Sequence, residues 1–275
     1  MKPVDFDYAK PATLSKATGL LAAADGGAKA VAGAQSLGPM LNLRLVQPDI
    51  LVDITAIPEL LGVREEAGCL VVGAAVTHAA LEDCMSDEPT RAVLAEIAHG
   101  IAYRAVRNRG TIGGSLAHAD PAADWLVCMA ALDAELVLVG SRGPRTVAVA
   151  EFVVGAFETV LASDELIVEV HVPLLSADAR FGYYKVCRRT GEFAAASAAV
   201  LVGEARGIAR AVIGATSGRP IVIEEAETAS EIAAEGRMAE DRVADALAPT
   251  ALAGDAFAIR VHGAALRRAA ARAAA

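Results

Sequence analysis

Two segments of the chain run from a short apolar stretch, which we interpret as a strand, into a loop of small residues. The first segment reads VAGAQSLGP at 31–39, and the second reads RGTIGGSLAHADP at 109–121. Small side chains leave the backbone N–H groups of such loops uncovered, and successive N–H groups form a concavity that binds anions. The two loops could therefore hold the two phosphates of a dinucleotide from either side.

The second loop leads into the clearest helix start of the sequence. Asp120 is a residue type favoured as an N-cap, Pro121 suits the first helical position, and the apolar stretch WLVCMAAL continues the predicted helix. The N-terminus of a helix carries a partial positive charge, which would add to the attraction of this loop for a phosphate.

Neither loop matches a common phosphate-binding motif. The chain contains no GxxxxGK[ST] and no GxGxxG sequence, which argues against a P-loop NTPase and a Rossmann dinucleotide fold. Tight turns without a ligand remain the alternative for either loop taken by itself. His118, Asp120 and Asp124 lack a metal-ligand spacing, and Ser115 does not fit a GxSxG elbow. We therefore predict neither a metal site nor a catalytic residue.

Composition places the chain among ordinary globular proteins. It has 275 residues, of which 55% are hydrophobic and 21% charged, and its formal net charge of −9 disfavours a nucleic-acid surface. No apolar run reaches the roughly 18 residues of a membrane span, and the start MKPVDFDY lacks an apolar signal segment, so we expect a cytoplasmic protein. The four cysteines form no CxxC pair, which predicts buried thiols rather than zinc or an iron–sulfur cluster.

The pattern of apolar residues predicts three units. In 1–55, a helix over PATLSKATGLLAAADGG precedes the short strands AKAVAG and ILVDI. In 56–175, we predict a strand at 69–76, a helix capped by Thr77, a helix at 91–102, and strands over AELVLVG, RTVAV and ELIVEVHVP.

The third unit, 176–275, changes character. Three antiparallel strands, FGYYKVCR, AAASAAVLVG and IARAVIGAT, are followed by helices over IEEAETASEIAAEG, DRVADALAP and DAFAIRVHGAALRRAAARAAA. Arg267, Arg268 and Arg272 lie near the end of the last helix, where cations are favoured by the helix dipole. The fold class predicted for the whole chain is α+β.

Several segments in register resemble the flavin subunit of the molybdenum hydroxylases. TIGGSLAHADPAAD (111–124) and AGAQSLGPMLNLRL (32–45) carry the resemblance most strongly. FDYAKPATLSKA, LVDI, FVVGAFETVLASDELIVEVHVP, YYKVCRRTGEFAAASAAV and IRVHGAALRRA follow the order and spacing of the family. That family includes the medium subunit of aerobic carbon monoxide dehydrogenase and the flavin domain of xanthine dehydrogenase.

The resemblance implies non-covalent FAD in a two-part FAD-binding domain (1–55 and 56–175) of the vanillyl-alcohol-oxidase/CO-dehydrogenase flavoprotein type. A C-terminal α+β domain with a three-stranded antiparallel sheet (176–275) follows. The residues that the resemblance assigns to the cofactor are Val31, Ala32, Gly33, Ala34, Gln35, Ser36 and Leu37 in the first loop, Gly110, Thr111, Ile112, Gly113, Gly114 and Ser115 in the second, and Asp124, Leu161, Ile167, Lys185 and Phe193 elsewhere.

Two of these assignments carry an open alternative. Ala34 stands where the family usually has the second glycine of AGGxS, and if that position needs a positive φ an alanine costs about 1 kcal/mol. Phe193 falls where relatives place an aromatic side chain near the flavin ring, but it could equally be an aromatic residue of a core strand.

The resemblance also implies a role without a protein acid or base. FAD would pass electrons from the [2Fe–2S] clusters of a small partner subunit to a final acceptor, beside a large molybdopterin subunit, in a dimer of heterotrimers. The alternatives are a stand-alone FAD oxidoreductase acting directly on a small molecule and a scaffold that has lost its flavin. The sequence names neither the substrate of the complex nor the final acceptor.

Overall fold

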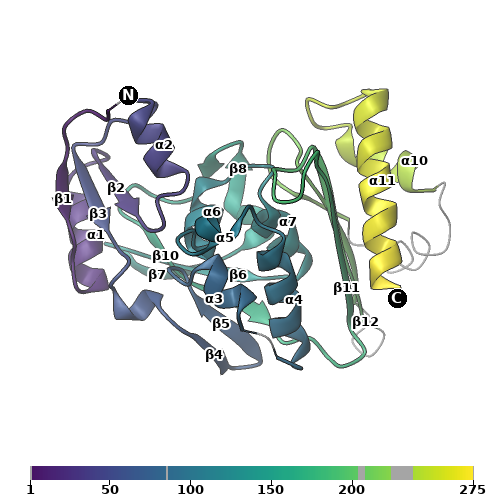
Figure 1. Cartoon of the computed structure of the whole chain (residues 1–275), viewed down its shortest axis with the longest axis horizontal. Coiled ribbons are helices and arrows are strands. Elements are labelled where there is room, and N and C mark those ends of the chain that lie inside the picture. Colours follow the sequence, from purple (N-terminus) through teal and green to yellow (C-terminus); the bar gives the residue numbers. More distant parts are fainter. Residues whose placement is uncertain (1, 85, 204–207, 224–237, 275) are drawn as a thin grey trace.

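The computed structural model describes residues 2–84, 86–203, 208–223 and 238–274. Three units follow one another along the longest axis of the molecule, from the N-terminal unit to the C-terminal helix (Figure 1). The predicted helix over IEEAETASEIAAEG lies almost entirely outside the described residues. None of the helices within these ranges is long and apolar enough to cross a membrane.

The first unit is a small parallel sheet with a helix packed against it. Its strands are β1 (Asp7–Ala9), β2 (Ala28–Val31) and β3 (Ile50–Asp53), and its helices are α1 (Leu14–Ala23) and α2 (Leu37–Asn42). The strand order is β1-β3-β2, so the apolar run of β3 lies in the centre. Both predicted strands of this unit are confirmed. The parallel register pairs Val31 with Asp53, so β2 and β3 end at the same edge of the sheet.

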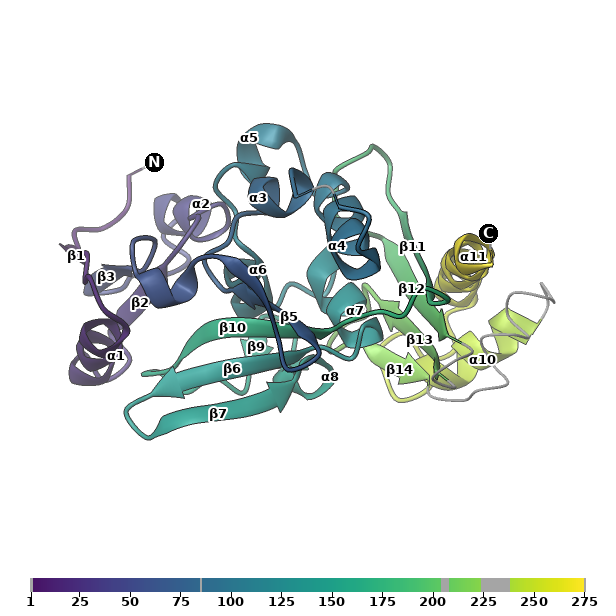
Figure 2. The same cartoon turned by 90° about the horizontal axis from the view of Figure 1, so that it is seen from below.

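The second unit is a five-stranded antiparallel sheet with helices on one side, as Figure 2 shows. Its strands are β4 (Val63–Glu66), β5 (Cys69–Gly73), β6 (Glu135–Gly140), β7 (Gly143–Ala148) and β10 (Leu166–Pro173), in the order β4-β5-β10-β6-β7. Its helices are η1 (Pro58–Leu60), α3 (His78–Glu82), α4 (Pro89–His99), α5 (Arg104–Arg107), α6 (Ile112–His118), α7 (Asp124–Ala131) and α8 (Val149–Phe152). A hairpin of β8 (Val153–Gly155) and β9 (Glu158–Thr159) completes it.

The predicted helix starts in this unit are partly confirmed. Thr77 caps α3 by accepting a hydrogen bond from the N–H of Ala80 (3.1 Å), as expected. The start expected at Asp120 and Pro121 is wrong, because α7 begins at Asp124. Asp120 instead accepts a hydrogen bond from the N–H of Ala122 (2.9 Å), which closes a local turn. An aspartate before a proline is equally suited to such a turn, and the sequence does not separate the two uses.

The third unit has four strands rather than three. β11 (Arg180–Val186), β12 (Ala196–Gly203) and β13 (Ile208–Gly214) are the predicted strands, and β14 (Ile221–Ile223) extends the sheet beyond β13. The helices α10 (Met238–Leu247) and α11 (Ala256–Ala273) cover its outer face (Figure 2). The added strand was missed because its three residues are too short for a period of two to be recognised.

Strand β12 is buried on both of its faces, because α7 packs against one face of the sheet and α11 against the other. Ala199 belongs to the hydrophobic cluster of α7, whereas Ala198 and Val200 belong to the cluster of α11. This follows from the alternation of side chains along a strand. The inner face of the C-terminal sheet therefore packs on the second unit.

The C-terminal helix approaches the sheet closely through small residues. A Cβ atom at Gly182 would lie 2.0 Å from the carbonyl oxygen of Ala269, so only glycine allows β11 and α11 to come this near. Arg268 and Arg272 place their guanidinium groups 4.9 and 5.1 Å from the ring centroid of Tyr184. Two members of the basic cluster thus fasten α11 to β11 by cation–π contacts, in addition to the dipole effect expected for the end of the helix.

Candidate functional site

The first loop presents a row of free backbone donors at the carboxyl edge of the parallel sheet. Within the described residues, no N–H group from Gly33 to Leu37 donates a hydrogen bond. The loop is held by bonds to its carbonyl groups instead: the N–H of Gly38 donates to Ala34 (2.9 Å), and the Gln35 amide donates to Gly33 (2.9 Å). Ligands of open α/β sheets bind at this edge, and five successive N–H groups suit an anion.

Ala34 has the left-handed backbone that the sequence left open. Its φ is +58°, so the position favours glycine, and the alanine carries a strain of about 1 kcal/mol. The strained residue is the second of the five residues with free donors. We infer that the turn which exposes these N–H groups requires the positive φ of Ala34, and that the fold tolerates the strain for this reason.

The second loop differs from the expected row of uncovered donors. Thr111 is the N-cap of α6, and its hydroxyl accepts a hydrogen bond from the N–H of Gly114 (3.1 Å). The N–H groups of Ile112 and Gly113 donate to the carbonyls of Val76 and Ala74 (3.1 and 2.9 Å). The prediction of an open loop is therefore wrong here: the segment is a short capped helix docked on the end of β5. A threonine followed by glycines fits a cap as well as a loop.

The structure brings the two loops into direct contact, although about 75 residues separate them along the chain. A Cβ atom at Gly33 would lie 2.1 Å from the carbonyl oxygen of Arg109 and 2.7 Å from the Cα of Gly110. A Cβ atom at Gly114 would lie 3.9 Å from the Cβ of Ala32. The free donors of the first loop therefore lie beside the N-terminus of α6, whose own first N–H groups are bonded within the protein.

Asp53 lies at the end of β3, opposite Val31, at the sheet edge from which the first loop leaves. Asp53 accepts hydrogen bonds from Tyr8 and from the N–H and hydroxyl of Thr55, and it forms an ion pair with Lys10 (3.2 Å). Burial alone would raise the pKa of this carboxyl group, but the bonds from Thr55 and Tyr8 prevail and lower it to about 2. The carboxylate is thus ionised and already satisfied by protein donors at neutral pH.

Asp124 and Lys185, two of the predicted residues, meet in a buried contact between the second and third units. Asp124 Oδ1 lies 2.8 Å from both Lys185 Nζ and the Tyr183 hydroxyl, and Lys185 also donates to the carbonyl of Gly100 (2.9 Å). Burial, and then Asp124, raise the pKa of Tyr183 well above its ordinary value. Tyr183 was missed by the sequence analysis, although its spacing of two from Lys185 places both on one face of β11.

Leu161 and Ile167 lie on either side of a short segment that is anchored by an ion pair. Ile167 is a core residue of β10, 4% exposed, and Leu161 is partly buried after β9. Arg145 pairs with Glu165 (2.7 Å) and donates to the carbonyl of Val160 (2.8 Å). Arg145 lowers the pKa of Glu165 and overcomes the opposing effect of burial. Arg145 and Glu165 therefore fix the backbone at Val160, the residue before Leu161.

Phe193 lies on the loop between β11 and β12 and is 64% exposed. The alternative of a core-strand aromatic is therefore excluded. The loop packs against the turn after α4, because a Cβ atom at Gly191 would lie 2.6 Å from the carbonyl oxygen of Ala102. His118, half-buried near the end of α6, contacts Phe157 in a tilted arrangement with ring centroids 5.2 Å apart, and burial lowers the pKa of His118.

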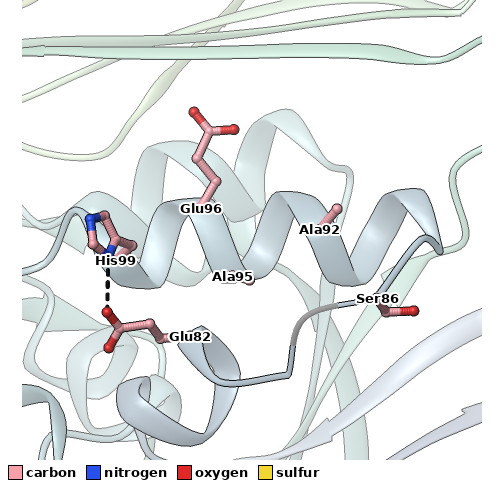
Figure 3. Close-up of a pocket in the computed structure, with 6 residues that line it drawn as sticks. All are labelled: Glu82, Ser86, Ala92, Ala95, Glu96 and His99. Carbon is pink, nitrogen blue, oxygen red and sulfur yellow. Dashed lines mark hydrogen bonds and ion pairs between the residues drawn. The ribbon is translucent and has the colours of Figure 1, made fainter.

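A pocket of about 310 Å³ lies elsewhere, between α3 and α4 (Figure 3). It is lined by Glu82, Ser86, Ala92, Ala95, Glu96 and His99. Glu82 forms ion pairs with Arg104, Arg107 and His99 at 2.7 to 2.9 Å. None of the predicted cofactor residues lines this pocket. We assign the function to the two loops, because the free N–H groups of the first loop specify an anionic ligand and lie beside the second loop.

Comparison with known proteins agrees with this architecture. Residues 4–175 match the family model described as the FAD binding domain in molybdopterin dehydrogenase, and the chain belongs to that family. Over 202 residues it is 40% identical to the carbon monoxide dehydrogenase medium chain of Hydrogenophaga pseudoflava, which covers 74% of this chain and 70% of that protein.

Two solved structures match along almost the whole chain. CO dehydrogenase from Oligotropha carboxidovorans matches with a TM-score of 0.88 at 32% identity, covering 99% of both chains. Quinoline 2-oxidoreductase from Pseudomonas putida 86 matches with a TM-score of 0.84 at 31% identity, covering 100% of this chain and 98% of that one. The predicted α+β fold with an FAD-binding domain is thus confirmed, and the chain is a flavoprotein member of an oxidoreductase family.

Proposed function

We propose that this chain is the FAD-binding electron-transfer subunit of a molybdenum-containing hydroxylase or dehydrogenase complex. It would take electrons from [2Fe–2S] clusters of a small partner subunit and deliver them to a final acceptor, beside a large molybdopterin subunit. We further propose a dimer of heterotrimers, and domain limits near residues 55 and 175. The medium-chain name of the Hydrogenophaga relative supports large and small partners.

The observation that carries the proposal is the row of free N–H groups from Gly33 to Leu37 facing the second loop. Phosphate oxygens are strong acceptors, and an array of fixed donors binds them without a basic side chain. This fits a chain with a net charge of −9. Gly114, exposed at the first turn of α6, would face the same pyrophosphate from the other side.

The other predicted residues would orient the rest of the cofactor. Lys185 and Tyr183 hold Asp124 at the start of α7, so β11 and α7 keep a fixed relation, and Phe193 remains exposed for contact with an aromatic ring. FAD, when bound, supplies the capacity to accept and release one or two electrons. The chain itself would bind, orient and shield the cofactor.

A charge placed in the first loop tests the proposal. Gln35 is exposed, so Gln35→Glu adds a carboxylate beside the free donors without filling the core. Gln35→Met removes the same amide contact without adding charge and serves as the matched control. We expect Gln35→Glu to raise the Kd for FAD about tenfold at low salt, through like-charge repulsion, while Gln35→Met stays close to wild type.

The measurement is the quenching of FAD fluorescence on titration with each protein, repeated at two salt concentrations. Equal Kd values for Gln35→Glu and Gln35→Met would place the phosphates elsewhere. Gly113→Val is not a suitable test, because a Cβ atom at this position would lie 2.5 Å from the Cβ of Ala74 and would disturb the fold itself.

A further inference from the structure

His78 is a buried side chain that touches the second loop from behind. Its backbone N–H donates to the carbonyl of Gly110 (2.9 Å), and the residue is 5% exposed. A Cβ atom at Gly110 would lie 2.8 Å from both Cδ2 and Nε2 of the imidazole. The ring therefore occupies the space that a side chain at position 110 would need, and the backbone of the loop rests on it.

The imidazole is itself fixed by a single donor. The indole Nε1–H of Trp125 donates to His78 Nδ1 at 3.1 Å. Because an indole N–H can only donate, Nδ1 must be unprotonated and the proton of the neutral ring lies on Nε2. Burial, followed by the charge of Arg107, lowers the pKa of His78 to about 4, so the ring stays neutral and the bond persists near pH 7.

Trp125 connects this contact to the rest of the proposed site. It follows Asp124, whose carboxylate holds Tyr183 and Lys185 of β11. A continuous series of contacts thus runs from β11 through Asp124 and Trp125 to His78, and from His78 to the second loop. The second loop in turn touches Gly33 of the first.

We propose that His78 is a positioning residue for FAD: the Trp125 bond fixes its ring, and the ring holds Gly110 against the first loop. This rests on the proposed FAD-binding role and extends it to a residue outside both loops. His78 makes no contact with the cofactor in this role. Its effect is to keep the two halves of the phosphate site at a fixed separation.

Two substitutions at position 78 separate positioning from packing. His78→Asn retains a side-chain oxygen that can accept from Trp125, whereas His78→Phe fills the space but offers no acceptor. We expect His78→Asn to bind FAD within about twofold of wild type, and His78→Phe to show a Kd raised about tenfold, as the loss of a buried hydrogen bond predicts. His99→Phe, at a histidine whose side chain is 76% exposed, is the control.

The assay is titration of the full-length apoprotein with FAD, with thermal unfolding measured on the same samples. Trp125 is the only tryptophan of the chain, so its emission reports directly on whether the bond to position 78 is present. We expect an altered emission for His78→Phe and a wild-type emission for His78→Asn. Lowered thermal stability of His78→Phe with an unchanged Kd would overturn the inference, since packing alone would then explain the residue.

A second variant decides the matter if His78→Phe does not fold. Trp125→Phe keeps an aromatic ring and removes the donor together with part of the buried indole volume, and we expect its Kd for FAD to rise about tenfold as well. An unchanged Kd for Trp125→Phe contradicts the inference while leaving the proposed function intact. Wild-type protein that takes up no FAD would instead overturn the proposed function and this inference together.

Discussion

Gly33 and Arg109 meet backbone to backbone: a Cβ atom on the glycine would lie 2.1 Å from the carbonyl oxygen of the arginine. This contact joins the end of the parallel sheet to the loop that begins α6. It explains the first glycine of the AGAQS segment without reference to a ligand, because no other residue allows the approach. The free donors that follow it are consequently set beside the second loop whether or not a ligand is bound.

Gly33→Ala should therefore destabilise the protein even without cofactor. Overpacking of this kind costs typically about 1–3 kcal/mol, and we expect a loss in that range in the free energy of unfolding from urea titrations. Gly19→Ala is the matched control, because Gly19 lies within α1 with open space around its Cα, and alanine there should stabilise by about 0.5–1 kcal/mol. Equal effects of the two changes would contradict the close approach.

Ala34→Gly should stabilise the chain. The φ of +58° strains alanine, and its replacement should raise the free energy of unfolding by about 1 kcal/mol with the first loop unchanged. Ala23→Gly, in the last turn of α1, should lower it by a similar amount because glycine is a poor helix former. Differential scanning calorimetry of both variants tests the sign, and destabilisation by Ala34→Gly would show that the positive φ is not kept in solution.

Breaking the Asp124–Lys185 pair should cost far more than a surface ion pair. Lys185→Met leaves a buried carboxylate with only the Tyr183 hydroxyl on Oδ1, and we expect a loss of about 3 kcal/mol in the apoprotein. The double variant Asp124→Asn with Lys185→Met should lose less than the sum of the single variants, because no buried charge remains. Additive losses in urea unfolding would argue that the two groups do not interact.

The acid stability of the protein should depend on Glu82. Arg107, in the first place, lowers the pKa of Glu82 to about 2, below the value of about 4.3 for an unfolded chain. The stabilisation from the carboxylate is thus complete above about pH 4.3 and is lost as the pH falls toward 2. Glu82→Gln should be less stable at pH 7 and should show a flatter dependence of stability between pH 4.3 and 2.

Glu59→Gln, at an exposed glutamate of η1, provides the control and should leave that pH dependence as it is in the wild type. Circular dichroism during acid titration follows the transition for all three proteins. A Glu82→Gln profile parallel to that of wild type would show that Glu82 is not a source of the acid sensitivity.

The sequence predicted most strands correctly, because short apolar runs rich in β-branched residues, such as ILVD and LIVEV, favour buried strands over helices. It placed the start of α7 three residues early, because Asp120 and Pro121 suit a turn as well as a helix start. Local signals of this kind are decided by the neighbouring backbone. Here the chain first ends α6 at Ala119, which has a φ of +50°.

The candidate site was predicted as two loops, but the different character of each could not be read from the sequence. Whether an N–H group is free depends on whether a carbonyl from another segment reaches it. Gly113 finds the carbonyl of Ala74, whereas Gly33 meets the carbonyl of Arg109 through its Cα and keeps its N–H free. The buried contact of His78 with Trp125 was likewise invisible, since the two residues are 47 positions apart.

The burial of β12 on both of its faces affects how the protein would respond to proteolysis and to heat. Loss of the C-terminal sheet would expose buried residues of α7 to solvent, and loss of α7 would expose Ala199 and Val212. A protease cut in the connection between β10 and β11 should therefore leave two fragments that stay associated under native conditions. The chain would melt as one cooperative body, and its flavin would be released in that same transition.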